Sequence, residues 1–392
     1  MIYFALLGAL FLFSLSDLSP RKNHSESLLN AYLYFIVFII LVCFAGLRFD
    51  TGWDYKGYHH YYDMIPPLES IPSHLDVFNS IYFEPGFKVL MALSKTFGLS
   101  FYSFQFLVSC ITMCIIHRAI STEKAKLLFL FLYFATCYLF LNMSFIRQGL
   151  AIAFLYLSVS MLFQGCKKTA IFYLLFGCLF HLSLIFILPV IVVANSNKLS
   201  NRILYLFVVV AITVYLVQLE WLRLAFKSVS FIFPSGLSYK VSTYLDSDKY
   251  GRSRDIGFGI VEKLTTFFIM IHIYNKQPNM RNKILLRFVV FYMITYFAFY
   301  EITILYDRLR LYFVALNVFV YLQFYYYFKG VNKGAVYAIL ILYCFFSYSN
   351  IFRSDFNRVV FIPYNSVLND ENSISPEFKG DFRVDRAGAM DR

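Results

Sequence analysis

The chain has 392 residues, of which 59% are apolar and only 15% are charged, and its mean hydropathy is +0.63. This composition excludes a water-soluble globule. The formal net charge is +12, but the basic residues are scattered through short loops, so no nucleic-acid partner is expected and the charges serve instead to orient the chain in a membrane.

Apolar runs recur along the chain between short polar breaks, and each has about the length that a helix needs to cross a bilayer. The runs do not alternate as porin strands do, and backbone groups in lipid must bond within their own segment. The sequence therefore predicts an all-α, polytopic membrane protein with about 10–12 transmembrane helices. The predicted spans are residues 2–17, 29–47, 101–117, 127–143, 147–164, 203–219, 256–274, 284–302, 309–328 and 334–349.

Two further segments are ambiguous. Residues 84–99 are short for a span and carry Lys88 and Lys95, which favours an interfacial helix. Residues 170–194 could cross once, or form a re-entrant hairpin with His181 near its tip. Only the hairpin, together with an interfacial 84–99, puts every short basic loop on the cytoplasmic side.

This topology predicts one transmembrane domain, residues 1–349, with extracytoplasmic loops at 48–100 and 220–255, and an extracytoplasmic tail at 350–392. It also brings the unusual polar residues of the chain to one membrane face. We therefore expect any chemistry to take place on the extracytoplasmic side.

Four arginines would lie at that face. Arg147 begins an otherwise apolar helix in NMSFIRQGLAIAF, which is costly unless it snorkels or binds an anion. The following Gln148-Gly149 weaken the snorkelling interpretation, because glycine permits close approach of a ligand or of another backbone segment. The other three have acidic neighbours and could equally be salt-bridged or interfacial anchors. Guanidinium groups bind phosphate bidentately, so together they predict a diphosphate site formed by Arg48, Arg147, Arg308 and Arg310.

His181 is either a hydrogen-bonded structural residue or an acid–base group. No metal is expected. His59, His60 and Asp63 lie close in sequence, but adjacent histidines seldom point at one ion. The Asp246–Asp248 stretch, DSD, is similar to the DxD motif of metal-dependent nucleotide-sugar transferases. That stretch lies in a highly charged segment, where a solvated loop is the default interpretation.

Several motifs occur in order over residues 48–364: RFDTGWDYKGYHHYY, FEPGFKVL, SFIRQGLAIA, LFHLSLIFILP, DRLRLYF and Pro363-Tyr364. Together they resemble the EpsG-like Wzy polymerase family. The resemblance implies a metal-independent glycosyltransferase with a GT-C-like fold and no cofactor, in the bacterial inner membrane. Such an enzyme transfers a growing glycan from undecaprenyl diphosphate to the non-reducing end of a lipid-linked repeat unit. Its partners would be those lipid-linked units, membrane lipids, a chain-length regulator and a flippase.

The resemblance also assigns roles to residues. Arginines would neutralise the leaving diphosphate, either Arg308 or Arg310 being the motif position. The base would be one of three residues, Asp54, Glu84 or His181. Glycan contacts would come from Trp53, Tyr55, Tyr58, Gln148 and Tyr312, with Gly52 allowing a turn.

Two other functions stay open: an O-antigen ligase, which uses the same donor, and a flippase for lipid-linked oligosaccharides. A flippase would need basic residues deep in several spans. A purely structural membrane protein would leave the arginines unexplained.

Overall fold

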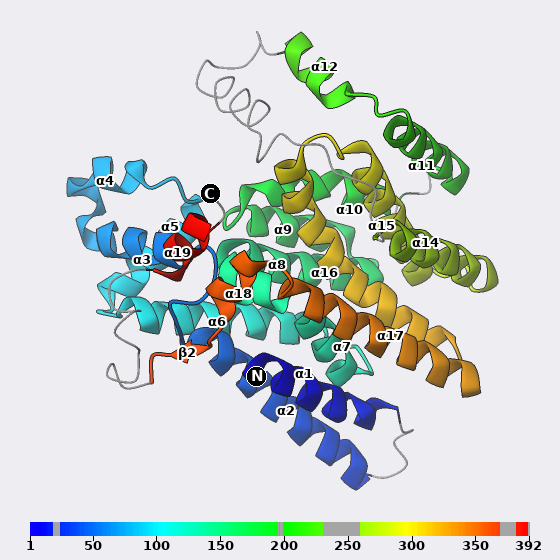
Figure 1. The fold of residues 1–392 in the computed structure, drawn as a ribbon, viewed down its shortest axis with the longest axis horizontal. Helices are drawn as coiled ribbons and strands as arrows, with labels where there is room; N and C mark the ends of the chain where they lie inside the picture. Colours follow the sequence, from blue (N-terminus) through cyan, green and yellow to red (C-terminus); the bar gives the residue numbers. More distant parts are fainter. Residues whose placement is uncertain (19–23, 195, 197–198, 230–258, 369–381, 391–392) are drawn as a thin grey trace. The chain divides into compact units, whose positions relative to one another are not determined.

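The computed structural model describes the chain except residues 19–23, 195, 197–198, 230–258, 369–381 and 391–392 (Figure 1). The described residues are overwhelmingly helical, which confirms the all-α prediction. The exception is a short antiparallel ribbon of β1 (Arg48–Phe49) and β2 (Asn365–Ser366), in which Arg48 pairs with Ser366 and Phe49 with Asn365.

Each predicted span coincides with helical structure, because the apolar runs set both the length and the burial of these segments. The helices are α1 (Ile2–Ser14), α2 (His24–Gly46), α6 (Phe101–Ala119), α7 (Lys126–Tyr133) with η3 (Phe134–Ser144), α8 (Ile146–Phe163), α11 (Asn201–Leu216), α14 (Gly259–Lys276), α15 (Met280–Ala298), α16 (Thr303–Tyr327) and α17 (Gly330–Ile351).

The chain is a multi-pass membrane protein. Within the part of the chain that the structure describes, five helices are long and apolar enough to cross a membrane. They are Ser25–Gly46, Phe101–Ala119, Lys126–Ser144, Ile146–Phe163 and Gly330–Ile351.

The segment η3 is π-helical, which the sequence did not reveal. It ends at the Phe145 break just before α8, and glycines pack against its carbonyl groups. A Cβ on Gly52, whose φ is +112°, would lie 1.9 Å from the Met143 oxygen, and one on Gly149 would lie 2.1 Å from the Leu141 oxygen. Only glycine fits at such close approaches. The π-helical segment thereby fixes the loop after α2 against the start of α8.

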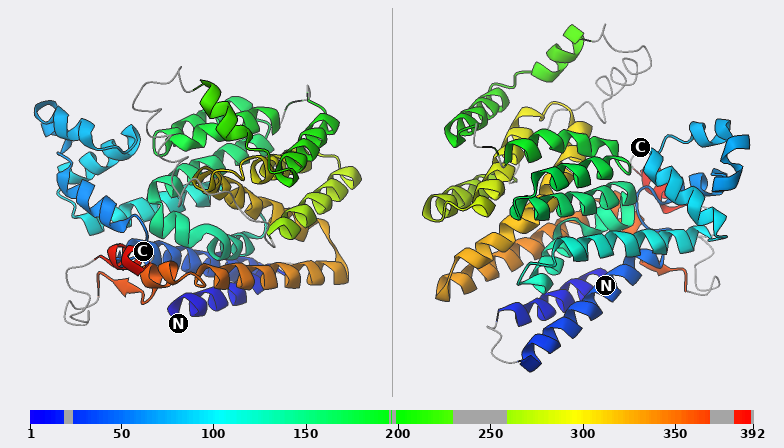
Figure 2. Two further views of the ribbon diagram at one scale, coloured as in Figure 1. Left: turned by 45° about the horizontal axis from the view of Figure 1, so that its top comes forward. Right: turned by 180° about the vertical axis from the view of Figure 1, so that it is seen from behind.

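Residues 48–100 form short helices: α3 (Tyr55–Met64), η2 (Leu68–Ser73), α4 (Leu75–Ser80) and α5 (Pro85–Thr96). At 12 residues, α5 is too short to span, as the sequence predicts for residues 84–99. Its interfacial position stays a prediction. Figure 2 shows these helices from two further sides.

The segment 170–194 is interrupted at His181. Helix α9 (Lys167–Cys178) ends before it, and η4 (Leu182–Ile187) and α10 (Leu188–Ala194) follow it. The break lies where the sequence predicts a hairpin tip, while re-entry into the membrane stays a prediction. Of the predicted 220–255 loop, α12 (Trp221–Val229) is described, and residues 230–255 lie outside the described part.

The chain divides into two compact units. The first comprises residues 1–161, 168–185 and 328–392, and the second comprises residues 162–167 and 186–327. In the first unit, the end of the chain returns to its beginning through α18 (Asp355–Phe361), β2 and α19 (Arg383–Met390). The Tyr3 hydroxyl donates to the Phe361 carbonyl at 2.6 Å, and the Val367 amide donates to the Leu47 carbonyl at 2.8 Å.

Candidate functional site

A carboxylate in the first unit joins three distant parts of the chain. Glu84 Oε2 accepts a hydrogen bond from Arg147 Nη1 at 2.5 Å, and Oε1 lies 3.0 Å from His181 Nδ1. The Leu182 amide also donates to Oε1, at 3.2 Å. The three side chains are only 13–15% exposed. An otherwise costly arginine at a helix start is therefore paired with a carboxylate.

Local structure explains how these residues meet. Glu84 directly precedes Pro85 at the first position of α5, where proline is favoured, and its side chain makes no capping hydrogen bond to that helix. The next residue, Gly86, donates its amide to the Leu179 carbonyl at 2.9 Å. A Cβ on Gly86 would lie 2.8 Å from that oxygen. Close backbone contact thus holds the start of α5 against the chain break at His181.

Aromatic rings surround the Arg147 guanidinium. Its central carbon lies 4.2 Å from the ring centre of Phe83, 5.7 Å from that of Tyr82 and 6.0 Å from that of Tyr58. Such contacts favour a cation held away from water. Sequence reasoning missed Tyr82 and Phe83, although their position directly before the FEPGF motif is a usable signal.

The same aromatic residues line a cleft of about 220 Å³. Asp54, at the cleft, accepts a hydrogen bond from the Tyr58 hydroxyl at 3.4 Å. Trp53 is anchored through its indole N–H, which donates to Asn357 Oδ1 at 3.0 Å. A cleft with aromatic faces and a carboxylate suits a polyhydroxylated ligand. The full lining is Trp53, Asp54, Lys56, Gly57, Tyr58, Tyr82, Phe83 and Val384.

Burial, hydrogen bonding and neighbouring charge determine the protonation state of Glu84 in the cluster. Burial alone would raise the pKa of Glu84, but the His181 hydrogen bond and the positive charge of Arg147 outweigh it and lower that pKa to about 2. Glu84 is then an acceptor-only carboxylate at neutral pH, so the proton of the shared hydrogen bond belongs to His181 Nδ1. In the described structure Arg147 Nε and His181 Nε2 are buried without a hydrogen-bond partner. Each therefore has one buried polar atom whose hydrogen-bonding capacity the described residues do not satisfy.

The part of the chain that holds the Glu84 cluster lies within a match to a known family. The sequence matches the family described as the EpsG family over residues 31–366. The chain belongs to the EpsG family. No curated protein and no solved structure matches it. In this EpsG-family chain, the cluster draws one residue from each of FEPGF, SFIRQG and LFHLSL, and RFDTGWDYKGY supplies the cleft.

Three residues predicted for the site are buried in this EpsG-family structure. Arg48 is 1% exposed, and its guanidinium donates to the carbonyls of Ala45 at 2.5 Å and Thr51 at 3.0 Å. It thereby joins the end of α2 to the following loop. Tyr55, 2% exposed, lies in an aromatic core cluster, and Gln148 is 1% exposed within α8. Diphosphate and glycan contacts by these three stay predictions without support from their surroundings.

The other predicted residues, Arg308, Arg310 and Tyr312, belong to the second unit, in α16. Tyr312 is fully buried, and Arg310 Nε lies 3.6 Å from Asp307 Oδ1, as the salt-bridge alternative predicts. Glu301 instead accepts hydrogen bonds from the Leu222 and Arg223 amides at the start of α12. The convergence of these arginines with Arg147 stays a prediction.

Asp246–Asp248 lies outside the described residues. Within the described ones, no group of three His, Cys, Asp or Glu side chains could hold a metal ion.

Sequence reasoning also missed a buried ion pair in the second unit. Lys263, 7% exposed, places its Nζ 2.9 Å from Glu262 Oε2 and over the rings of Tyr292 and Tyr296, at 4.9 and 4.5 Å. The Tyr321 hydroxyl donates to the other oxygen of Glu262 at 2.6 Å. Two charged residues in succession at the start of an apolar run are the signal that was available.

Proposed function

We propose that this EpsG-family protein is a Wzy-type polysaccharide polymerase. It transfers a growing glycan from undecaprenyl diphosphate to the non-reducing end of a lipid-linked repeat unit, at the extracytoplasmic face of the bacterial inner membrane. The observation that carries the proposal is the buried Glu84–Arg147–His181 cluster beside an aromatic cleft.

The reaction needs positive charge where the diphosphate leaves. The acceptor oxygen forms a bond to the anomeric carbon, the bond from that carbon to the phosphate oxygen breaks, and undecaprenyl diphosphate departs with the electron pair. Arg147 stays charged at any accessible pH and keeps its Nε free of protein partners. Fixed positive charge in a site shielded from water stabilises the developing anion. Arg308 or Arg310 is the proposed second contact to the diphosphate.

The acceptor hydroxyl must lose a proton. With Nδ1 donating to the Glu84 carboxylate, a neutral His181 carries its lone pair on Nε2. Glu84 fixes this tautomer and the ring orientation, as carboxylates do in other histidine-based sites. We assign His181 as the base and Glu84 as its positioning residue. Asp54, Tyr58 and Trp53 then bind sugar hydroxyls and faces in the cleft.

The direct test is polymerisation by the purified protein in lipid nanodiscs, supplied with one lipid-linked repeat unit. We expect a ladder of products that His181→Asn and Arg147→Ala abolish. The control His74→Asn should leave the ladder intact, because His74 is exposed and bonds only locally. An unchanged ladder in His181→Asn would refute its assignment as the base.

Two further arms separate the alternatives. A chelator should leave the ladder unchanged; if it abolishes activity and magnesium restores it, metal-independent catalysis is wrong and Asp246 and Asp248 become the leading site residues. Offering lipid A core as acceptor distinguishes a ligase, which would use it, from a polymerase. Transport of the lipid-linked unit without any ladder would favour the flippase. A flippase and a chain-length regulator remain proposed partners of the polymerase.

A further inference from the structure

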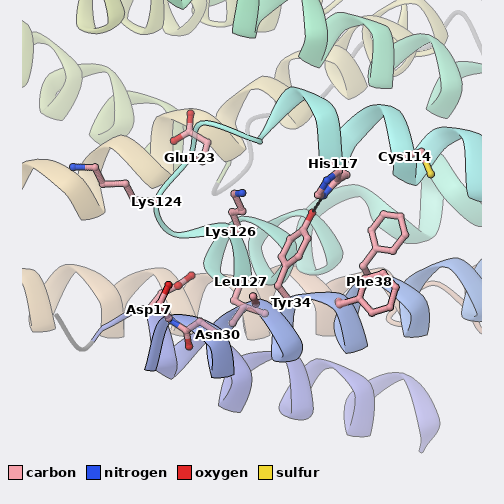
Figure 3. A pocket seen from close by; sticks show the side chains of 13 residues that line it. Asp17, Asn30, Tyr34, Phe38, Cys114, His117, Glu123, Lys124, Lys126 and Leu127 are labelled. Carbon is pink, nitrogen blue, oxygen red and sulfur yellow. Dashed lines mark hydrogen bonds between the residues drawn. The ribbon is translucent and has the colours of Figure 1, made fainter. Parts of the chain in front are cut away.

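A second pocket, of about 580 Å³, lies in the first unit away from the Glu84 cluster (Figure 3). The two sites lie near opposite ends of helix α6. Tyr62, from the same helix as Tyr58, packs on Phe101 and Phe104 at the start of α6, whereas the pocket uses Cys114 and His117 near its end. From Phe101 to Cys114 the helix rises about 20 Å, most of a bilayer core. The pocket therefore lies toward the other membrane face.

The lining of this pocket is divided by chemistry. Figure 3 shows Asp17, Asn30, Glu123, Lys124 and Lys126 on one side and Phe38 with Cys114 on the other. Between them, the Tyr34 hydroxyl lies 2.8 Å from His117 Nδ1. A polar end and an apolar end in one pocket match an amphipathic ligand.

The apolar end of the pocket is open at the exposed face of helix α2. Phe35, which lines the pocket, is 59% exposed, and so are many of its apolar neighbours along that helix. Since α2 is one of the helices long and apolar enough to span, this exposed face lies against lipid in a membrane. The exposed apolar neighbours of Phe35 on helix α2 are Leu28, Leu29, Tyr32, Ile36 and Ile39. A lipid acyl chain can therefore enter the pocket from the side.

The polar end offers a cation. Lys126 Nζ lies 5.8 Å from the ring centre of Tyr34, and among the described residues it makes no ion pair. Asp17 directs a carboxylate oxygen to the Leu128 amide at 3.0 Å, at the start of α7. Glu123 is 5% exposed, and Lys124 is exposed at the rim. Lys126 is thus the group best placed to receive an anion at the depth where lipid headgroups lie.

We propose that this pocket binds a membrane glycerophospholipid. Lys126 binds the lipid phosphate, with Lys124 beside it at the rim, and the acyl chain lies along Phe35 and Phe38. The Tyr34–His117 pair contacts the glycerol ester region between these ends. The site is separate from the proposed glycan chemistry and does not depend on it.

The test is lipid retention by the full chain in mild detergent, read by native mass spectrometry after delipidation and titration with phosphatidylethanolamine or phosphatidylglycerol. We expect one tightly bound phospholipid per chain, and about tenfold weaker binding in Lys126→Gln, the loss expected for one charge-assisted contact. The control Lys95→Gln should bind as the wild type, since Lys95 lies in α5 and donates to the Asp63 carbonyl.

A second pair of variants tests the pocket without changing charge. Ala31→Trp fills the pocket and should abolish the bound lipid, whereas Ile39→Trp, on the exposed face of the same helix but outside the lining, should retain it. Equal lipid retention in both would overturn the proposal, and so would displacement of the bound lipid by excess inorganic phosphate alone, which would indicate a simple anion site.

Discussion

Replacing Glu84 by glutamine removes the one charge that joins Arg147 to His181. In the folded protein the pKa of Glu84 falls from its ordinary 4.5 to about 2, despite burial, because of the His181 hydrogen bond and the charge of Arg147. Each pKa unit corresponds to about 1.4 kcal/mol, so the ionised carboxylate stabilises the fold by about 3 kcal/mol. Glu84→Gln should lose that amount at neutral pH.

The sign of the pH dependence follows from the lowered pKa. The stabilisation is fully present above pH 4.5 and is lost as the pH falls toward 2. The difference in unfolding free energy between wild type and Glu84→Gln should therefore be about 3 kcal/mol at pH 7 and shrink below pH 4.5.

Reversible unfolding in mixed micelles, followed by circular dichroism at several pH values, measures this difference. Glu69→Gln is the matched control, because Glu69 is exposed in the same loop and bonds only to Thr96 Oγ1. That control should change stability by less than about 0.5 kcal/mol. If Glu84→Gln is as stable as wild type at pH 7, or if its deficit persists unchanged in acid, the cluster does not exist as described.

Three other predictions concern charged residues. Arg147→Lys should slow polymerisation at least tenfold at equal expression, because an ammonium is a point charge without the guanidinium fork; an unchanged rate would make Arg147 a mere anchor. Arg48→Met should destabilise the fold by about 2 kcal/mol yet leave affinity for lipid diphosphate unchanged, measured by titration, since its Nε and Nη1 donate to backbone carbonyls. Lys263→Met should cost about 3 kcal/mol by leaving Glu262 unpaired in an apolar bundle, and adding Glu262→Gln should restore most of it in the same unfolding assay.

Helix positions were predictable because apolar length alone specifies a membrane helix. Ten spans were predicted from it; within the described residues a helix lies in each of them, and five of these helices are long and apolar enough to cross a membrane. The sequence also singled out Glu84, Arg147 and His181, but as separate candidates. Their pairing joins positions 63 and 97 residues apart, and no local pattern encodes such contacts.

The predictions were less useful where a residue's role depends on tertiary burial. Arg48 and Tyr55 have the right chemistry for a site, yet the first is enclosed by backbone carbonyls and the second by aromatic rings. The π-helical segment was also missed, since its apolar sequence fits an α-helix equally well. The sequence signal of the π-helical segment is a pair of glycines, Gly52 and Gly149, which pack against its backbone carbonyls.

The C-terminal segments pack against the loop after α2, so this loop can finish folding only after the end of the chain has been synthesised. Arg383 donates its amide to Asp50 at 3.1 Å across 333 positions, and β2 pairs with β1. At the usual rate of synthesis, about 15 to 70 s separate the two segments leaving the ribosome. During that interval the loop with Trp53 and Asp54 lacks its closing strand and helix. The half-made protein would then expose aromatic surface, which makes this loop the natural target for chaperones and proteases during biogenesis.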